Sequence, residues 1–192
     1  TPGALRGGLQ TVARHPTKDE VLVGGADGVP QIYRVFRETD RKIGDNANLI
    51  RRFPGMEGRV FGVDYSADGN RIAAGSSLDG HGSVNIYSAA FDSTISTNLA
   101  KILEKVVSSQ SAEEKAEVEK YVTADVKLEK TVTFSDVSIY TVGFSPDGTR
   151  VAAAGSDGRI RLIDSETGAI VTEFASAPLA EKAGGLAADD SS

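Results

Sequence analysis

Apolar and polar residues alternate most regularly in the last third of the chain. Tyr140, Val142 and Phe144 are separated by smaller residues, which is the period of a β-strand with one buried face. Short apolar runs follow at 151–154, 160–163 and 170–174. Turn-forming residues separate these runs, so the segment predicts four antiparallel strands joined by hairpins.

The turn residues have specific backbone requirements. The run at 145–148 is Ser-Pro-Asp-Gly, which presets a tight turn because Pro fixes φ and Gly permits a positive φ. Asp157 with Gly158 is a typical hairpin pair, and Thr167 with Gly168 turns the chain into the last apolar run. Together these features predict one complete four-stranded unit.

The same layout occurs twice earlier in the chain. In the second copy, an alternating run at 61–65 precedes Ser-Ala-Asp-Gly at 66–69. In the first copy, His15 opens the turn and the preceding strand around Val12 is less regular. Repeats of four antiparallel strands are typical of β-propeller blades. The sequence therefore predicts an all-β fold, a partial β-propeller of three four-stranded antiparallel blades, at approximately 8–54, 58–134 and 138–174.

Two insertions lengthen the first and second units. Equivalent turn positions lie 51 residues apart in the first two units (68 − 17) and 79 apart in the last two (147 − 68), whereas a typical blade occupies roughly 40 to 45 residues. The smaller insertion is expected at 38–48, where polar residues and turn formers gather. The larger one, at 95–122, is expected to be a helical hairpin, with a capping box of Ser111 and Glu114 at the start of its second helix.

The first helix of this hairpin carries one apolar stripe. Leu99, Ile102, Leu103 and Val106 fall at i, i+3, i+4 and i+7, so a helix would place them on one face. One interpretation is that the hairpin packs on its own blade. The other is that Leu99, Ile102 and Val106 bind a partner protein or a neighbouring domain, as amphipathic helices can.

The third unit resembles a WD40 repeat. The resemblance rests on Phe-Ser-Pro-Asp-Gly at 144–148, Gly-Ser-Asp-Gly at 155–158 and Ile-Arg-Leu-Ile-Asp at 160–164, followed by Thr167 and Gly168. This resemblance implies a β-propeller that acts as an interaction module. More narrowly, the chain is similar to propeller segments of large exported bacterial proteins that also carry a c-type cytochrome domain, which would imply an exported or periplasmic location.

The chain departs from the WD40 pattern at several positions. Tyr33, Tyr87 and Ile163 replace the family's tryptophan. Asp27 and Asp157 occupy its hairpin-aspartate position, where we expect them to hold turns. In the second unit His81 stands at that position.

Composition narrows the possible classes of function. The net charge of -6 argues against a nucleic-acid partner, since the scattered Lys and Arg residues form no basic patch. No apolar run approaches the roughly 20 residues that span a bilayer, so no membrane insertion is expected. Cysteine is absent, which removes thiolate metal sites and covalent haem attachment from this chain.

No catalytic, metal or cofactor site is predicted. The two histidines, His15 and His81, are far apart in the sequence and do not form a zinc-binding pattern. Nucleophile elbow, P-loop and dinucleotide fingerprints are absent from the sequence. His81 lies in Asp-Gly-His-Gly at 79–82, which we expect to be an enlarged hairpin. One interpretation is a solvated loop histidine, and the other is a residue that contacts a partner.

Three blades cannot close a ring, because closed propellers usually have roughly four to eight. The chain begins at Thr1 rather than at Met, and periodicity is lost over 175–192, an Ala- and Gly-rich linker or tail. We therefore expect a segment of a larger propeller that acts as a scaffold for other proteins or for neighbouring domains of the same polypeptide. Open blade edges could also bind copies of the chain. The alternative is part of an enzyme's propeller whose catalytic residues lie in other domains.

Overall fold

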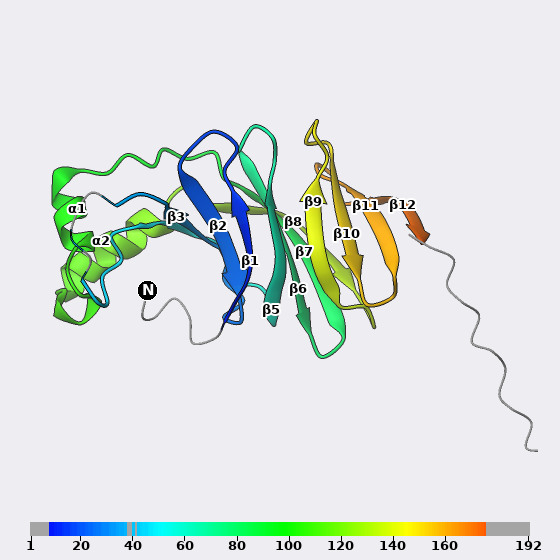
Figure 1. Ribbon diagram of the computed structural model, residues 1–192, viewed down its shortest axis with the longest axis horizontal. Helices are drawn as coiled ribbons and strands as arrows, with labels where there is room; N and C mark the ends of the chain where they lie inside the picture. The colour runs from blue at the N-terminus through cyan, green and yellow to red at the C-terminus, as the bar shows by residue number, and fades with distance from the viewer. Residues whose placement is uncertain (1–7, 38–39, 41, 176–192) are drawn as a thin grey trace, which may run out of the picture.

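The computed structural model describes residues 8–37, 40 and 42–175. Its strands form three antiparallel sheets of four strands each, which stand side by side as three blades (Figure 1). Consecutive strands are neighbours within every sheet. The predicted fold class, a partial β-propeller of three blades, is confirmed. The predicted tail beyond Ala175 lies outside the described residues.

The strand bounds follow the order of the chain. Blade 1 contains β1 (Leu9–Arg14), β2 (Glu20–Gly25), β3 (Gln31–Arg34) and β4 (Leu49–Arg52). Blade 2 contains β5 (Arg59–Tyr65), β6 (Arg71–Leu78), β7 (His81–Ser88) and β8 (Lys127–Phe134). Blade 3 contains β9 (Ile139–Phe144), β10 (Arg150–Gly155), β11 (Arg159–Asp164) and β12 (Ile170–Ala175).

A side-chain acceptor holds the turn between the first two strands of each blade. In blade 2 the Ser66 hydroxyl accepts a hydrogen bond from the backbone N–H of Arg71 at 3.0 Å. In blade 1 the imidazole of His15 takes the place of this serine. Its Nδ1 accepts hydrogen bonds from the N–H groups of Thr17 and Lys18 at 3.2 and 3.1 Å. His15 is therefore a turn residue, as predicted, and it is also buried.

Each pair of neighbouring blades encloses its own apolar core. The first core combines Leu22 and Ile32 of blade 1 with Val60, Ile72 and Tyr87 of blade 2. The second combines Ala73, Val84 and Ile86 of blade 2 with Val142, Val151 and Ile163 of blade 3. Blade 2 thus contributes alternate residues of its strands to its two neighbours, because successive side chains point to opposite faces of a sheet.

Tyr87 replaces the tryptophan of the WD40 pattern with a different set of contacts. Its ring is completely buried and meets Phe53 edge-on, with ring centroids 5.4 Å apart. The hydroxyl donates a hydrogen bond to the carbonyl oxygen of Pro54 and accepts one from Asn85, both at 2.9 Å. Burial raises the pKa of Tyr87 to about 12, so it remains a neutral donor that links blade 2 to the end of blade 1.

The predicted helical hairpin is present, but its first helix is shorter than the apolar stripe indicated. The helix α1 (Thr97–Leu103) ends before Val106, which is extended with φ −60° and ψ 131°. The last carbonyl groups of α1 are occupied by residues outside the helix. The Asn46 N–H donates to Leu103 O at 3.2 Å, and the Gln110 amide donates to Ile102 O at 3.0 Å. The prediction that Val106 continues the helix face was wrong.

A short 3-10 turn, η1 (Val107–Ser109), connects α1 to α2 (Ala112–Val122). The predicted capping box is confirmed, since the Ser111 hydroxyl accepts from the Glu114 N–H and the Glu114 carboxylate accepts from the Ser111 N–H. No described helix is long and apolar enough to cross a bilayer.

The hairpin packs on blade 1, although it is inserted between β7 and β8 of blade 2. Figure 1 shows the helices beside blade 1, at the end of the row of blades. The shared core contains Leu49 of β4 together with Leu99, Ile102, Leu103, Val118 and Val122 of the hairpin. Leu49 pairs with Tyr33 of β3, so both lie on the face of blade 1 that points away from blade 2. The expectation that the hairpin packs on its own blade was wrong.

Two arginines of blade 1 explain this placement. They hold the link that runs from β7 to α1 against the outer strands of blade 1. Arg34 donates to the carbonyl oxygen of Ser93 at 2.7 Å, and Arg51 donates to that of Asp92 at 2.8 Å. The link is thereby directed over the rim of blade 1 before the hairpin begins.

Candidate interaction surface

The open face of blade 3 repeats a face that blade 2 buries. Strand pairing places Ala152 opposite Leu162 in blade 3, as it places Ala73 opposite Ile86 in blade 2. Ala73 and Ile86 are completely buried in the core shared with blade 3. The equivalent Ala152 and Leu162 are only partly buried, because no sheet within the described part of the chain covers them.

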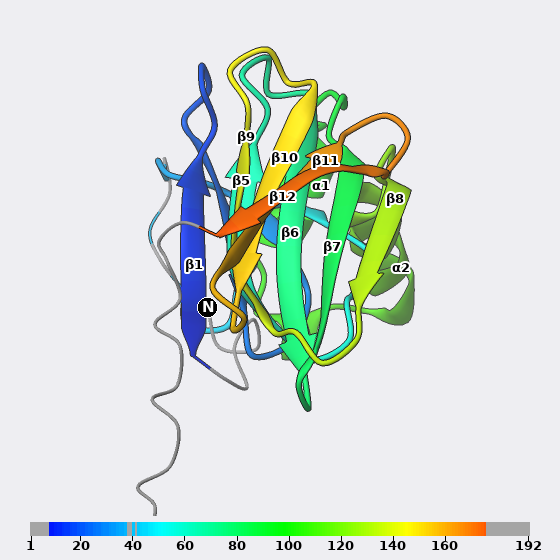
Figure 2. The ribbon, with the colours of Figure 1, turned by 90° about the vertical axis from the view of Figure 1, so that its right-hand side faces the viewer.

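Blade 1 also buries the side chains at these two positions of the repeat against the next blade. Leu22 lies opposite Ile32, and both are completely buried in the core shared with blade 2. In blade 3 the apolar area continues toward the rim, where Phe174 of β12 pairs with Ile160 and is 44% exposed. Figure 2 looks onto this end of the molecule, with blade 3 in front of blade 2. We call Ala152, Ile160, Leu162 and Phe174 the open blade face.

A buried arginine accounts for the outward position of these apolar side chains. Arg161 of β11 points to the core side and is 6% exposed. It forms ion pairs with Asp157 and Glu173 and lies 5.2 Å from the ring centre of Phe134 in blade 2. Asp157 also accepts a hydrogen bond from the Arg159 N–H, which confirms its predicted turn-holding role. Since side chains alternate along a strand, Ile160 must lie on the open side.

The far face of blade 1 is covered over only part of its width. The helical hairpin covers Leu49 and packs against Tyr33 in the outer strands. In the inner strands Val12 is 66% exposed, and Val21 and Val23 are partly exposed. The two ends of the row of blades therefore differ, because helices cover part of the blade 1 face, whereas no described helix or sheet covers the corresponding face of blade 3.

The two insertions form one structure at the outer rim of blade 1. The Val107 N–H donates to Gly44 O at 3.0 Å, and the Asn46 N–H bonds to the end of α1 as described above. The side chain of Val106 lies close to Gly44, where an added Cβ would be 3.2 Å from Val106 Cγ1. Segments more than fifty positions apart in the sequence thus stabilise each other.

Asp45 organises the smaller insertion. Arg37 donates to both of its carboxylate oxygens, at 2.9 and 2.7 Å, and the N–H groups of Lys42 and Ala47 donate as well. The hydrogen bonds from Arg37 hold the pKa of Asp45 at about 2. Asp45 is consequently ionised at neutral pH, and its oxygens are used within the chain.

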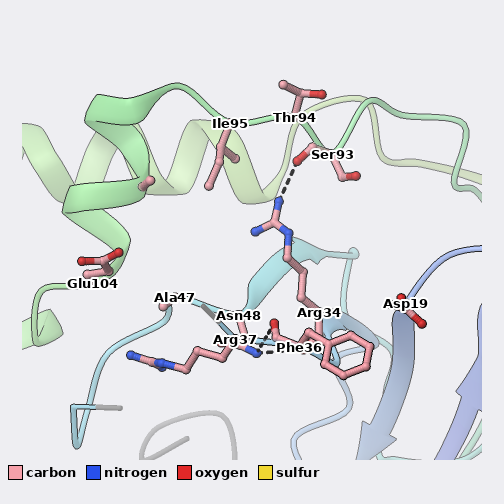
Figure 3. Close-up of a pocket in the computed structure, with 11 residues that line it drawn as sticks. Asp19, Arg34, Phe36, Arg37, Ala47, Asn48, Ser93, Thr94, Ile95 and Glu104 are labelled. Atoms are coloured by element: carbon pink, nitrogen blue, oxygen red, sulfur yellow. Dashed lines mark hydrogen bonds between the residues drawn. The ribbon is translucent and has the colours of Figure 1, made fainter. Parts of the chain in front are cut away.

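A groove of about 440 Å³ lies between the smaller insertion of blade 1 and the link that leads into α1. Figure 3 shows Arg34 and Phe36 on one side of the groove, with Ile95 and Glu104 on the other. Arg34 crosses the groove to reach the Ser93 carbonyl. The Asn48 amide donates to the carbonyl oxygens of Arg34 and Phe36 at 2.9 and 3.4 Å, so it holds the wall of the groove in shape.

The structure separates the residues that the sequence singled out for partner binding. Leu99 and Ile102 are 8% and 4% exposed, so their contacts are within the hairpin core. Val106 is partly exposed where the two insertions meet. His81 is exposed on blade 2, beside a different hollow of about 250 Å³ that Glu57 also lines. A partner-binding role for these residues stays a prediction.

The hairpin that carries His81 differs from the expected enlarged loop. β6 and β7 each have eight residues, and only Asp79 and Gly80 connect them. Asp79 and Gly80 both have positive φ, at 49° and 85°, as a two-residue hairpin turn requires. The additional residues lengthen the paired strands, so His81 belongs to a strand end rather than to a loop.

The residues of the groove carry no signal in the sequence. Arg34, Phe36 and Asn48 lie in or beside an irregular insertion, where no periodicity marks a side chain as exposed or buried. The open blade face could have been predicted from the sequence, because alignment of the repeats places Leu162 at the position of Ile86, which is buried in blade 2.

Two stretches of the sequence match protein-family models. Residues 47–88 match the WD domain, G-beta repeat, and residues 128–180 match the anaphase-promoting complex subunit 4 WD40 domain. The unmatched residues between them are those of the link and the helical hairpin. These matches support a WD40-repeat family, whose repeats generally mediate protein–protein interaction. No curated protein matches the sequence. The resemblance to exported cytochrome-carrying proteins stays a prediction.

Proposed function

We propose that this chain is a non-catalytic interaction scaffold and a segment of a larger β-propeller, whose open blade face binds the sheet of a further blade of the same polypeptide. The observation that carries the proposal is the equivalence of Leu162 with Ile86. The same position of the repeat is completely buried in blade 2 and partly exposed in blade 3.

The free energy of burying apolar side chains favours a sheet packed on the open blade face. Burial of one large apolar side chain contributes about 1.5–3 kcal/mol. Ile160, Leu162 and Phe174 lie together, and Phe174 is 44% exposed. A sheet docked here would remove this apolar surface from water, as blade 3 does for the equivalent surface of blade 2.

A polar side chain supports the same interpretation. Arg71, at the start of β6, reaches from blade 2 to the Gly148 carbonyl of blade 3. Arg150 stands at the equivalent start of β10. It forms an ion pair with Asp164 of its own blade and is partly exposed, so it is placed to contact a following turn.

The test is the behaviour of the open blade face in solution. We expect the purified chain to bind a hydrophobic dye and to associate reversibly as its concentration rises, measured by light scattering after size exclusion. Leu162→Glu is expected to reduce both effects, with little change in the thermal unfolding midpoint, because Leu162 is only partly buried.

Val35→Glu is the matched control, since Val35 is 53% exposed but lies outside the open blade face. It is expected to leave dye binding and association unchanged. A wild-type chain that stays monomeric without binding dye would contradict the proposal, as would an equal effect of the two substitutions.

A further inference from the structure

The groove between the two insertions contains an arginine without a carboxylate partner among the described residues. Arg34 is partly buried, and its side chain donates a hydrogen bond to the neutral Ser93 carbonyl at 2.7 Å. The neighbouring Arg37 is different, because Asp45 pairs with it at 2.7 Å. A guanidinium group has five N–H donors, so Arg34 retains donors that can bind an anion.

Apolar side chains lie beside this charge. Phe36 is 70% exposed, although it lines the groove. Ile95 lines the opposite wall and is partly exposed (Figure 3). A ligand that fits this groove therefore combines an anionic group with apolar groups on either side.

The remaining charges limit the class of anion. Asp19 and Glu104 also line the groove, so its overall charge is mixed rather than strongly positive. A polyanion such as nucleic acid would be repelled by these carboxylates, whereas a single carboxylate placed at Arg34 would gain a charge-assisted hydrogen bond. This balance favours an acidic side chain within a peptide.

We propose that the groove binds an extended segment of a partner protein in which Asp or Glu is flanked by apolar residues. The carboxylate pairs with Arg34, and the apolar side chains pack on Phe36 and Ile95. The inference rests on the proposed function, since it names the chemistry of a partner for the interaction scaffold. It concerns a surface formed by blade 1 and the two insertions, so it can fail while the open blade face still binds a blade.

The probe is a fluorescently labelled five-residue peptide in which Glu alternates with Leu, and binding to the full chain is followed by fluorescence anisotropy. A matched peptide with Gln in place of Glu is the ligand control. We expect Arg34→Gln to weaken binding of the Glu peptide at least about tenfold, the usual effect of a lost charge-assisted hydrogen bond. Glu104→Gln is expected to strengthen binding about two- to threefold, because it removes a repelling charge at the groove.

Arg59→Gln is the protein control, because it removes the same charge from an exposed position on β5. It is expected to leave the affinity unchanged. The helical signal in circular dichroism checks that the Arg34→Gln variant still folds its helical hairpin. If that variant fails to fold, the stronger binding expected of Glu104→Gln still tests the proposal. The proposal is overturned by equal binding of the Glu and Gln peptides, by equal effects of the Arg34 and Arg59 substitutions, or by no binding up to about 1 mM, the limit of weak recognition. Failure here with a positive result for Leu162→Glu would leave the proposed function intact.

Discussion

The guanidinium group of Arg71 in blade 2 donates a hydrogen bond to the carbonyl oxygen of Gly148 in blade 3, at 2.7 Å. A second N–H of Arg71 donates to the hydroxyl of Ser165 at 3.0 Å. One junction earlier, the ring of His15 in blade 1 lies against Gly69, the equivalent glycine of blade 2. Each junction therefore joins a basic side chain to the first turn of the next blade.

Arg71→Met tests the contribution of this contact to stability. Methionine retains an apolar stem but removes both donors, so we expect the free energy of unfolding to fall by about 1–2 kcal/mol. Ser165 still donates to Gly148 at 2.8 Å, which limits the loss. Urea denaturation measures the change. Arg59→Met, at an exposed position, should have little effect, and a similar loss for both variants would show that the contact is not the cause.

Substitution of the two turn glycines should give unequal losses. Gly69 and Gly148 have φ values of +73° and +71°, so alanine at either position costs about 1–2 kcal/mol of backbone strain. At Gly69 the added Cβ would also lie 2.4 Å from the His15 ring, whereas at Gly148 the nearest atom is 3.4 Å away.

We therefore expect Gly69→Ala to cost at least about 1 kcal/mol more than Gly148→Ala. The measurement is urea denaturation of both variants. His15→Ser combined with Gly69→Ala should recover the difference, since serine is the residue of the other two turns. Equal losses without such recovery would rule out crowding by His15.

His15 should make stability depend on pH below neutrality. Burial lowers the pKa of His15 from 6.5, while the nearby Glu20 carboxylate opposes this effect and Lys18 adds to it. The unfolded chain therefore takes up a proton first as the pH falls. Stability is complete above about pH 6.5 and declines from there toward the lower pKa of the folded state.

Urea midpoints at pH 7.5 and 5.5 measure this dependence. His15→Ser should flatten it. Asp45 and Asp147 are not expected to contribute in this range, because hydrogen bonds hold their pKa values at about 2. An unchanged pH dependence in His15→Ser would refute the assignment to His15.

The helical hairpin should respond differently to changes at Leu103 and Val106. Leu103 is 1% exposed in the core with Leu49, so Leu103→Ala should cost about 2–5 kcal/mol and loosen the hairpin. Val106 is partly exposed and lies beyond the end of α1, so Val106→Ala should cost under about 1 kcal/mol. Amide hydrogen exchange in α1 and α2 measures the loosening. Equal effects would mean that Val106 belongs to the hairpin core after all.

Local chemistry accounts for the parts of the fold that were predictable. The alternation of Tyr140, Val142 and Phe144 located β9, although Tyr140 is 50% exposed because the strand pairing shifts register beside it. The Ser-Pro-Asp-Gly turn located the start of β10. The capping box of Ser111 and Glu114 located α2. Each of these signals acts between residues that are close in sequence.

The candidate surfaces were less predictable, because they combine distant segments. The groove joins Arg34 and Asn48 of blade 1 to the link at Ile95 and to Glu104 of α1. The end of α1 depends on Asn46, which lies in the other insertion. No pattern within a single window of sequence contains these relationships.

The sequence by itself determined that the chain forms three blades, in which order their strands pair, and where two insertions interrupt them. Only the tertiary structure decided which face of each blade is covered. Strand periodicity separates two faces, but it does not state which face meets another sheet. In blade 3 the buried Arg161 points to the core side, which places Ile160 on the open side, and in blade 1 the hairpin covers Leu49 because Arg34 and Arg51 hold its link there. The blade 1 contacts join segments far apart in the sequence, and in blade 3 the guanidinium of Arg161 also meets the ring of Phe134 in blade 2, so both outcomes depend on how neighbouring blades pack.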